Sequence, residues 1–225
     1  AAASSYETAD RWINFEATDG AYTTEQSTDH PLGSGYSHKA QVTTADTSIG
    51  AAQYSYIAQR IEAQNLQHLL YGTSSAKSLT LSFYVKSNKT GTYCITASAG
   101  AIANDNGLGI EVGFHLALGS NFTGGTSDSW SAGSNNHYGT TNQVNWMDST
   151  SNNFYLAEVQ LELGEQPTPF EHRSFGDELA RCQRYYSQYD STNGGWVGSG
   201  FFYDADTVES TVRLPQRMRA APTVS

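Results

Sequence analysis

The sequence predicts an all-β protein whose main part is a β-sandwich of two antiparallel sheets. Several segments alternate apolar with polar residues, as a strand with one buried face does. Gly, Ser, Thr and Asn separate these segments and only 15% of residues are charged, a composition that favours short strands joined by polar turns. We expect the sandwich to occupy residues 1–173, a connecting helix 174–188, and an incomplete C-terminal β-segment 189–225.

The charge of the chain bears on its expected partners. With 22 acidic and 12 basic side chains, the formal net charge is -10, and no basic cluster occurs. Nucleic-acid binding depends on Lys and Arg contacts to phosphate, so we expect none. We also expect no membrane partner, because no apolar run is long enough to span a bilayer and no signal peptide is visible. The chain begins without Met, so we expect its native N-terminus to be missing or processed.

The first half of the chain contains five strand patterns. They cover residues 10–18, 36–44, 53–61, 79–85 and 92–98. The turn sequence Asn88 to Gly91 joins the last two, so we expect them to pair as a β-hairpin. Residues 62–71 switch to helical spacing, and Gly72 is a natural stop for a short amphipathic helix.

The second half opens with the longest alternation. Its apolar positions are Leu108, Ile110, Val112, Phe114, Leu116 and Leu118. We expect this strand to be central, because a long apolar face at a sheet edge promotes aggregation. Residues 119–142 form a Gly/Ser/Thr/Asn-rich loop, and loops of that length are often functional. Residues 143–147 are expected to form a short strand.

Residues 153–163 alternate again before a helix. Their expected buried face consists of Tyr155, Ala157, Val159, Leu161 and Leu163. Pro167 and Pro169 then end the strand, because proline cannot donate to a ladder. A helix is expected from Asp177 to about Tyr186, capped by Ser174 or Asp177, with two further strands at residues 196–205 and 207–214.

The junction after that strand resembles one found in bacteriophage tail-fibre and other virion proteins. There a last jelly-roll strand VQLE-G is followed by TPFE-R and a helix EL-CQRYY, and this chain reads VQLELGEQPTPFEHRSFGDELARCQRYY. Residues 10–12 (DRW), 79–93 (LTLSFYVKSNKTGTY) and 214–224 (LPQRMRAAPTV) are similar to further parts of the same family, marine and cyanobacterial phages in particular.

The resemblance implies a carbohydrate-binding-module-like jelly roll in a non-enzymatic virion protein. Its expected role is that of a tail-fibre module, on the tail or capsid surface, that attaches the phage to bacterial surface polysaccharide. Fibre-like virion proteins are commonly homotrimers, so other copies and other virion proteins are expected partners. The alternatives are a structural capsid-decoration or fibre-assembly domain without sugar binding, and an ancillary domain of a polysaccharide depolymerase.

Two details of the family bear on this chain. Related jelly rolls often hold one structural Ca²⁺ and no other cofactor is expected, but the spacing of the loop acids Asp19, Asp46, Asp105 and Asp128 selects no ligand set. Relatives also have a longer piece, with a Trp-bearing strand, where this chain has only residues 96–107. Either this protein lacks a strand pair, or its natural chain contains further residues there.

Glycan binding requires flat aromatic faces with amide and carboxylate groups beside them. The candidates in and after the long loop are Trp130, Tyr138, Trp146, Asn135, Asn136 and Asp128. The alternative is that Trp146 is a core residue and that the loop is only solvated or contacts a neighbouring subunit. Trp12 is expected to be structural.

A second aromatic concentration surrounds the C-terminal helix. Its candidates for an oligomer contact are Tyr185, Tyr186, Tyr189 and Trp196. The alternative is that these side chains pack on the sandwich of their own chain.

No pattern in the chain predicts catalysis. Glu158 and Glu162 share a strand face about 13 Å apart at strand rise, whereas glycosidase carboxylate pairs lie roughly 5–9.5 Å apart. No nucleophile elbow or HExxH motif occurs. Cys94 and Cys182 are the two cysteines, and we expect free, buried thiols rather than a disulfide.

Overall fold

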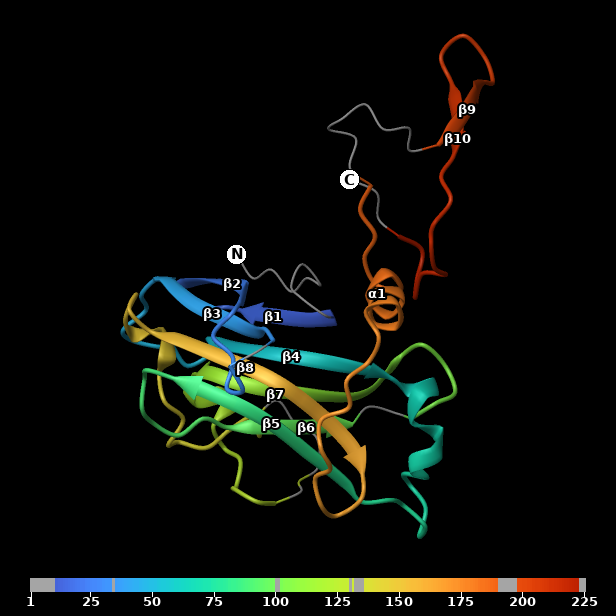
Figure 1. Ribbon diagram of the computed structural model, residues 1–225. Helices are drawn as coiled ribbons and strands as arrows, with labels where there is room; N and C mark the ends of the chain where they lie inside the picture. The colour runs from blue at the N-terminus through green and yellow to red at the C-terminus, as the bar shows by residue number, and fades with distance from the viewer. Residues whose placement is uncertain are drawn as a thin grey trace. The chain divides into compact units, whose positions relative to one another are not determined.

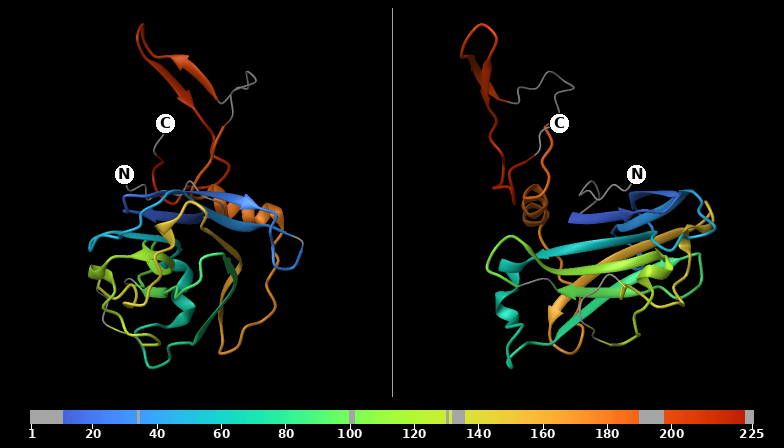
Figure 2. Two further views of the ribbon diagram at one scale, coloured as in Figure 1. Left: turned by 90° about the vertical axis from the view of Figure 1, so that its left-hand side faces the viewer. Right: turned by 180° about the vertical axis from the view of Figure 1, so that it is seen from behind.

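The structure is a computed structural model that describes residues 11–33, 35–99, 102–129, 131, 136–189 and 198–222. The chain divides into two compact units, Ala1–Glu171 and His172–Ser225, and each is described by itself. The first unit contains two antiparallel four-stranded sheets that face one another (Figures 1 and 2). The predicted all-β class is therefore confirmed. No helix in the described part of the chain is long and apolar enough to cross a membrane.

The first sheet has the strand order β1-β4-β7-β6. The strands are β1 (Trp12–Glu16), β4 (Tyr54–Glu62), β7 (Leu108–Leu118) and β6 (Ile95–Ala99). The predicted central position of β7 is confirmed, since β4 and β6 pair with its two edges. Both faces of β7 are buried. The alternation predicted that one face would be exposed to solvent, but side chains outside the core cover it.

The second sheet has the order β2-β3-β8-β5. The strands are β2 (Ala21–Ser27), β3 (Ser37–Thr44), β8 (Asn153–Leu163) and β5 (Leu79–Ser87). β2 was not predicted, because its residues AYTTEQS carry no apolar alternation. It forms at the sheet edge through backbone pairing with β3, which any side chains permit.

The predicted hairpin between residues 79–85 and 92–98 is wrong. β5 pairs with β8 in the second sheet, whereas β6 pairs with β7 in the first. The connecting segment crosses between the sheets, and its backbone finds other partners. The N–H of Val144 donates to the Thr92 carbonyl at 2.8 Å, and the N–H of Cys94 donates to Oε1 of Gln143 at 2.8 Å. These bonds replace the ladder that a hairpin would have supplied.

The core lies between the two sheets and contains side chains from both. Fully or almost fully buried members include Ile57, Phe114, Leu116, Val42, Phe154 and Trp146. Each such side chain contributes roughly 1.5–3 kcal/mol of transfer free energy before entropy is subtracted. Trp12 is also buried and lies 5.9 Å from Phe114 between ring centroids, which confirms its predicted structural role.

A β-bulge in β8 changes which side chains face the core. Phe154 and Leu156 point inward before it, and Val159 and Leu161 pack against the core after it, so the predicted single alternation is wrong. At the bulge two β8 residues oppose one β5 residue, and Glu158 has a left-handed φ of 49°. One extra residue reverses the faces of a strand because its side chains have a period of two.

Two short 3₁₀ helices fall on segments with a predicted secondary structure. The short amphipathic helix predicted over residues 62–71 is confirmed as η2 (Ala63–Leu69), with 3₁₀ geometry. η4 (Trp146–Asp148) replaces the predicted strand of residues 143–147, which is therefore wrong. The Asn145 side chain caps η4 by accepting from the N–H of Met147 at 2.9 Å, a local bond that competes with strand geometry.

The second unit contains a helix and a hairpin. α1 (Phe175–Gln183) begins at Ser174, whose hydroxyl accepts from the Asp177 N–H at 3.2 Å, so the predicted cap is confirmed. β9 (Ser199–Phe202) pairs antiparallel with β10 (Val208–Thr211), and all of their residues are exposed. Cys94 and Cys182 form no disulfide with each other, as predicted, but both side chains are half-buried rather than buried.

Candidate functional site

An aromatic cluster covers the face of the first sheet that points away from the second sheet. Ile57 and Phe114 point into the core, so the adjacent residues Tyr56 and His115, which lie opposite each other on β4 and β7, point to the other face. The cluster consists of Phe15, Tyr54, Tyr56, His115, Phe122 and Tyr138.

The rings of the aromatic cluster contact one another in a continuous network. Phe15 stacks on Tyr56 at 4.4 Å between centroids, and Tyr138 stacks on His115 at 5.6 Å. Phe122 links the two ends, since it lies 6.0 Å from Tyr138 and meets Tyr54 edge-on at 5.3 Å. Such pairs each add about 0.5–1.5 kcal/mol beyond area burial, so the ring contacts stabilise this arrangement of the cluster.

The inner rings are buried and the outer rings are accessible. Tyr56 is 7% and His115 1% exposed, whereas Tyr54, Phe122 and Tyr138 are half-buried. Burial raises the pKa of Tyr56 and of Tyr138, so both hydroxyls keep their protons at neutral pH. The outer rings therefore offer apolar area together with a hydroxyl that can donate or accept.

The neighbouring histidine is electrically neutral. Burial lowers the pKa of His115 to about 3, and its Nε2 lies 2.9 Å from Oγ1 of Thr96. Nδ1 of His115 is buried without a hydrogen-bond partner in the described part of the chain. The neutral His115 ring next to Tyr138 brings no charge to the surface. A ligand at this side of the aromatic cluster would therefore meet stacked, uncharged rings.

A charged pair lies at the other end of the aromatic cluster. Nε of Arg60 donates to Oε2 of Glu111 at 2.6 Å, and the Arg60 guanidinium lies 5.0 Å from the ring centroid of Phe15. The Arg60 side chain is 39% exposed and that of Glu111 10%. Charge-assisted bonds of this kind hold the guanidinium in place, and its outward side is within reach of a ligand.

The long loop holds Tyr138 against the sheet through glycine. The N–H of Gly139 donates to the carbonyl of Phe122 at 3.0 Å. A Cβ atom on Gly139 would lie 2.6 Å from Cδ1 of Leu118 and 3.1 Å from Sγ of Cys94, so a larger residue there requires these side chains to shift. The isolated bridge between Gly124 and Thr140 ties the two arms of the loop together.

The structure brings one predicted glycan-binding residue, Tyr138, into the aromatic cluster. Asp128 and Asn136 lie exposed on the loop, Asp128 with a left-handed φ of 56° and Asn136 accepting a backbone bond from Gly124. Trp130 and Asn135 lie outside the described residues. The prediction for Trp146 is wrong, because it is fully buried and packs edge-on against Tyr22 at 5.7 Å, which leaves no face for a sugar.

The predicted oligomer residues are spread over the second unit. Tyr185 is half-buried, and Tyr186 and Tyr189 are exposed, with Tyr189 donating its hydroxyl to the carbonyl of Arg213. Trp196 lies outside the described residues. The structure contains one chain, so the subunit contact stays a prediction.

Sequence reasoning missed the residues of the aromatic cluster other than Tyr138. The signal available in the sequence was the alternation along β4. Tyr54 and Tyr56 alternate with Ser55 and Ile57, so the two tyrosines share one face of the strand. Aromatic side chains on the strand face that points away from the core indicate that this face is covered or binds a ligand. That signal needs the pairing of β4 with β7 before it places His115 beside Tyr56.

Two of the four loop acids considered for calcium, Asp46 and Asp105, act as turn caps. Oδ2 of Asp46 accepts from the N–H of Asp19 and Oδ1 from the N–H of Ser48, each at 3.0 Å. Oδ1 of Asp105 accepts from the N–H of Gly107 at 2.9 Å. Within the described ranges, no group of three or more His, Cys, Asp and Glu side chains has the arrangement of a metal site.

Comparison of the chain with protein families, curated proteins and solved structures finds no match. The phage resemblance of the junction is therefore carried forward as a proposal.

Proposed function

We propose that this chain is a non-enzymatic bacteriophage virion protein, a tail-fibre module whose carbohydrate-binding-module-like jelly roll recognises host cell-surface glycan. The aromatic cluster is the observation that carries the glycan part of this proposal. Sugar C–H faces pack on aromatic rings while hydroxyls bond to nearby polar groups. The half-buried rings of Tyr54, Phe122 and Tyr138, with Arg60 at the far end, offer both kinds of contact.

The virion part of the proposal rests on the junction at residues 159–186 and its resemblance to tail-fibre proteins. Binding at one such site is weak, because a solvated sugar offers little apolar area. A homotrimeric fibre presents several sites to one polysaccharide, and avidity then exceeds the affinity of each site without any new contact. This mechanism requires no covalent step and no cofactor.

The test is binding of the purified chain to a panel of bacterial surface polysaccharides by calorimetry. Tyr138→Ala removes an outer ring of the aromatic cluster, and we expect a loss of about tenfold in affinity. Trp130→Ala tests the loop. Tyr84→Ala is the matched control, because Tyr84 is 46% exposed on β5 of the other sheet. Equal affinities of the wild type and the Tyr138→Ala variant would contradict this assignment of the site.

The second candidate function is a structural capsid-decoration or fibre-assembly domain that makes subunit contacts without binding sugar. It is favoured by the large apolar side chains exposed in the second unit, where Phe175 is 82% and Phe202 80% exposed. Exposed apolar surface of this kind marks contacts with partners. Polysaccharide binding by neither the monomer nor an assembled oligomer would favour this function over the first.

A further inference from the structure

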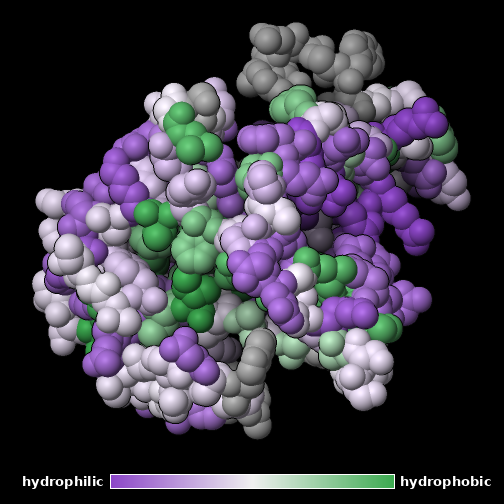
Figure 3. Space-filling view, turned by 60° about the horizontal axis from the view of Figure 1, so that its bottom comes forward, coloured by the Kyte–Doolittle hydropathy of each residue, from purple (hydrophilic) through white to green (hydrophobic). Residues whose placement is uncertain are grey.

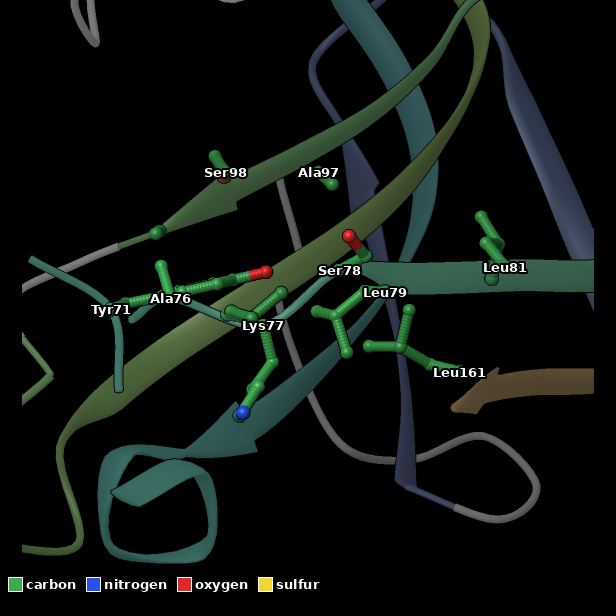
Figure 4. A pocket seen from close by; sticks show the side chains of 11 residues that line it. Tyr71, Ala76, Lys77, Ser78, Leu79, Leu81, Ala97, Ser98 and Leu161 are labelled. Carbon is green, nitrogen blue, oxygen red and sulfur yellow. The ribbon is translucent and has the colours of Figure 1, made fainter. Parts of the chain in front are cut away.

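The first unit is open along one side, between the edge strands β5 and β6. Two cavities of about 620 and 510 Å³ follow each other there. The first is lined by Leu79 and Leu81 of β5, Leu161 of β8 and Ala97 of β6, as Figure 4 shows, and the second by Phe83 and Val85 of β5 with Ile95 of β6. We call these two cavities together the open groove.

The open groove exposes side chains that point toward the core. Val85 lies opposite Leu156, and Ile95 opposite Phe114, so both share a face with buried core residues. Val85 is nevertheless 52% and Ile95 40% exposed. Figure 3 shows hydrophobic side chains gathered in a hollow of the molecule seen from below. A core face left open to this extent indicates a surface that another segment covers.

Both rims of the open groove are suited to an added strand. β5 and β6 each end their sheet, so neither has a second neighbouring strand among the described residues. An edge strand presents a row of backbone donors and acceptors that an extended segment can pair with. The occupant should therefore be an extended polypeptide with apolar side chains on one face.

The charge of the open groove differs from that of the whole chain. The chain has 22 acidic and 12 basic side chains, yet the described residues that line the groove include Lys77 and Lys89 and no Asp or Glu. Lys89 pairs with Asp148 at 2.5 Å, whereas Lys77 has no ion pair in the described part of the chain. The groove is thus matched to an apolar segment that carries acidic groups.

The β9–β10 hairpin has the matching properties. Phe202 and Val208 lie opposite each other and are 80% and 58% exposed. Between Ser199 and Thr211 the sequence contains three acidic residues and no Lys or Arg, namely Asp204, Asp206 and Glu209. A two-stranded hairpin alone is marginally stable in water, so it needs a surface to pack on.

We propose that the open groove is a docking site for the β9–β10 hairpin of a second copy of this chain. The hairpin adds to an edge of the groove, Phe202 and Val208 enter its cavities, and the turn acids Asp204 and Asp206 face Lys77. Each copy presents one groove and one hairpin, so the contact joins different surfaces. The assembly closes either as a dimer, in which two copies exchange their hairpins, or as a ring of copies.

The experiment is sedimentation velocity of the full chain and its variants over a concentration series. Phe202→Asp alters the hairpin and Val85→Asp the groove, and both side chains are exposed enough for the folds to persist, which thermal melts verify. We expect each variant to weaken self-association at least about tenfold. We expect an equal mixture of the two variants to associate again, because one supplies an intact groove and the other an intact hairpin.

A control and a second readout sharpen the test. Tyr36→Asp changes a 61% exposed aromatic residue outside both surfaces and should leave association unchanged. Cys94 lines the second cavity, so in a Cys182→Ser background its reaction with a thiol reagent should be slower in the assembled protein than in the Phe202→Asp variant. A monomeric wild type, association that survives Phe202→Asp, or variants that fail to complement each other would each overturn the proposal.

Discussion

Two buried histidines make the stability of the first unit depend on pH. Burial lowers the pKa of His38 to about 4 and that of His115 to about 3, from 6.5. Neither ring nitrogen of His38 has a hydrogen-bond partner among the described residues, and its neighbour is the ring of Trp12 at 6.2 Å. The folded chain therefore holds both rings neutral while the unfolded chain takes up protons below pH 6.5.

The sign and size of the effect follow from linkage. Because the folded pKa values are lowered, the stabilisation is fully present above pH 6.5 and is lost as the pH falls toward 4. The loss is about 1.4 kcal/mol per pH unit per histidine within that window. From pH 7 to pH 5 it amounts to roughly 2 kcal/mol for each ring and ~4 kcal/mol together, a large part of the 5–15 kcal/mol typical of a domain.

One carboxyl group acts in the opposite direction. Burial raises the pKa of Glu16 above 4.5, against hydrogen bonds from Thr18 that lower it. A raised carboxyl pKa means that the folded state gains protons more readily, so acidification stabilises it through this group. Glu16→Gln removes that compensation, and we expect the variant to lose more stability between pH 7 and pH 5 than the wild type.

Urea unfolding followed by tryptophan fluorescence at pH 7, 6 and 5 measures the effect. In His38→Gln and His115→Gln, we expect the difference in unfolding free energy between pH 7 and pH 5 to shrink by about 2 kcal/mol each, whatever the stability at pH 7. His68→Gln, at an exposed position of η2, is the control. A His115→Gln variant with the same pH dependence as the wild type would refute the assignment.

Three further substitutions test other parts of the structure. Gly119→Ala should destabilise the first unit by more than about 3 kcal/mol in urea unfolding, because its Cβ would lie 2.0 Å from the carbonyl oxygen of Gly50; a stable alanine variant would show that this approach is not tight. Asn152→Ala should lower the unfolding free energy by about 1–3 kcal/mol in the same assay, because Nδ2 of Asn152 donates to the buried carbonyl of Trp146 at 2.8 Å. An unchanged urea midpoint would contradict that role. Ser174→Ala should remove about 0.5–2 kcal/mol of helix stability, visible as lost helical ellipticity, whereas Ser174→Asp should retain it.

Local patterns predicted most of the strands because side-chain alternation encodes burial directly. β7 shows this best, since its apolar positions alone indicated both a strand and its central place. The cap of α1 was also visible, because Ser174 and Asp177 are three residues apart and their bond is local. The strand β2 left no such signal, since its polar side chains depend on backbone pairing with β3.

The candidate site was predicted only at Tyr138. The long loop is conspicuous in its composition, but Tyr138 meets Tyr56 of β4 and His115 of β7, which are far apart in the chain. Trp146 shows the reverse error, since an aromatic residue in a polar context suggested a ligand surface although the residue belongs to the core.

The sequence by itself determined the all-β class, most strand positions, the helix cap and the acidic charge, because each depends on neighbouring residues or on composition. Only the tertiary structure decided that β5 and β6 belong to different sheets, that a bulge at Glu158 reverses the inward face of β8, and that Tyr56 and His115 meet. The physical reason is that strand pairing is made by backbone groups, which are the same in every residue. Which edges meet therefore depends on how the whole chain packs its core.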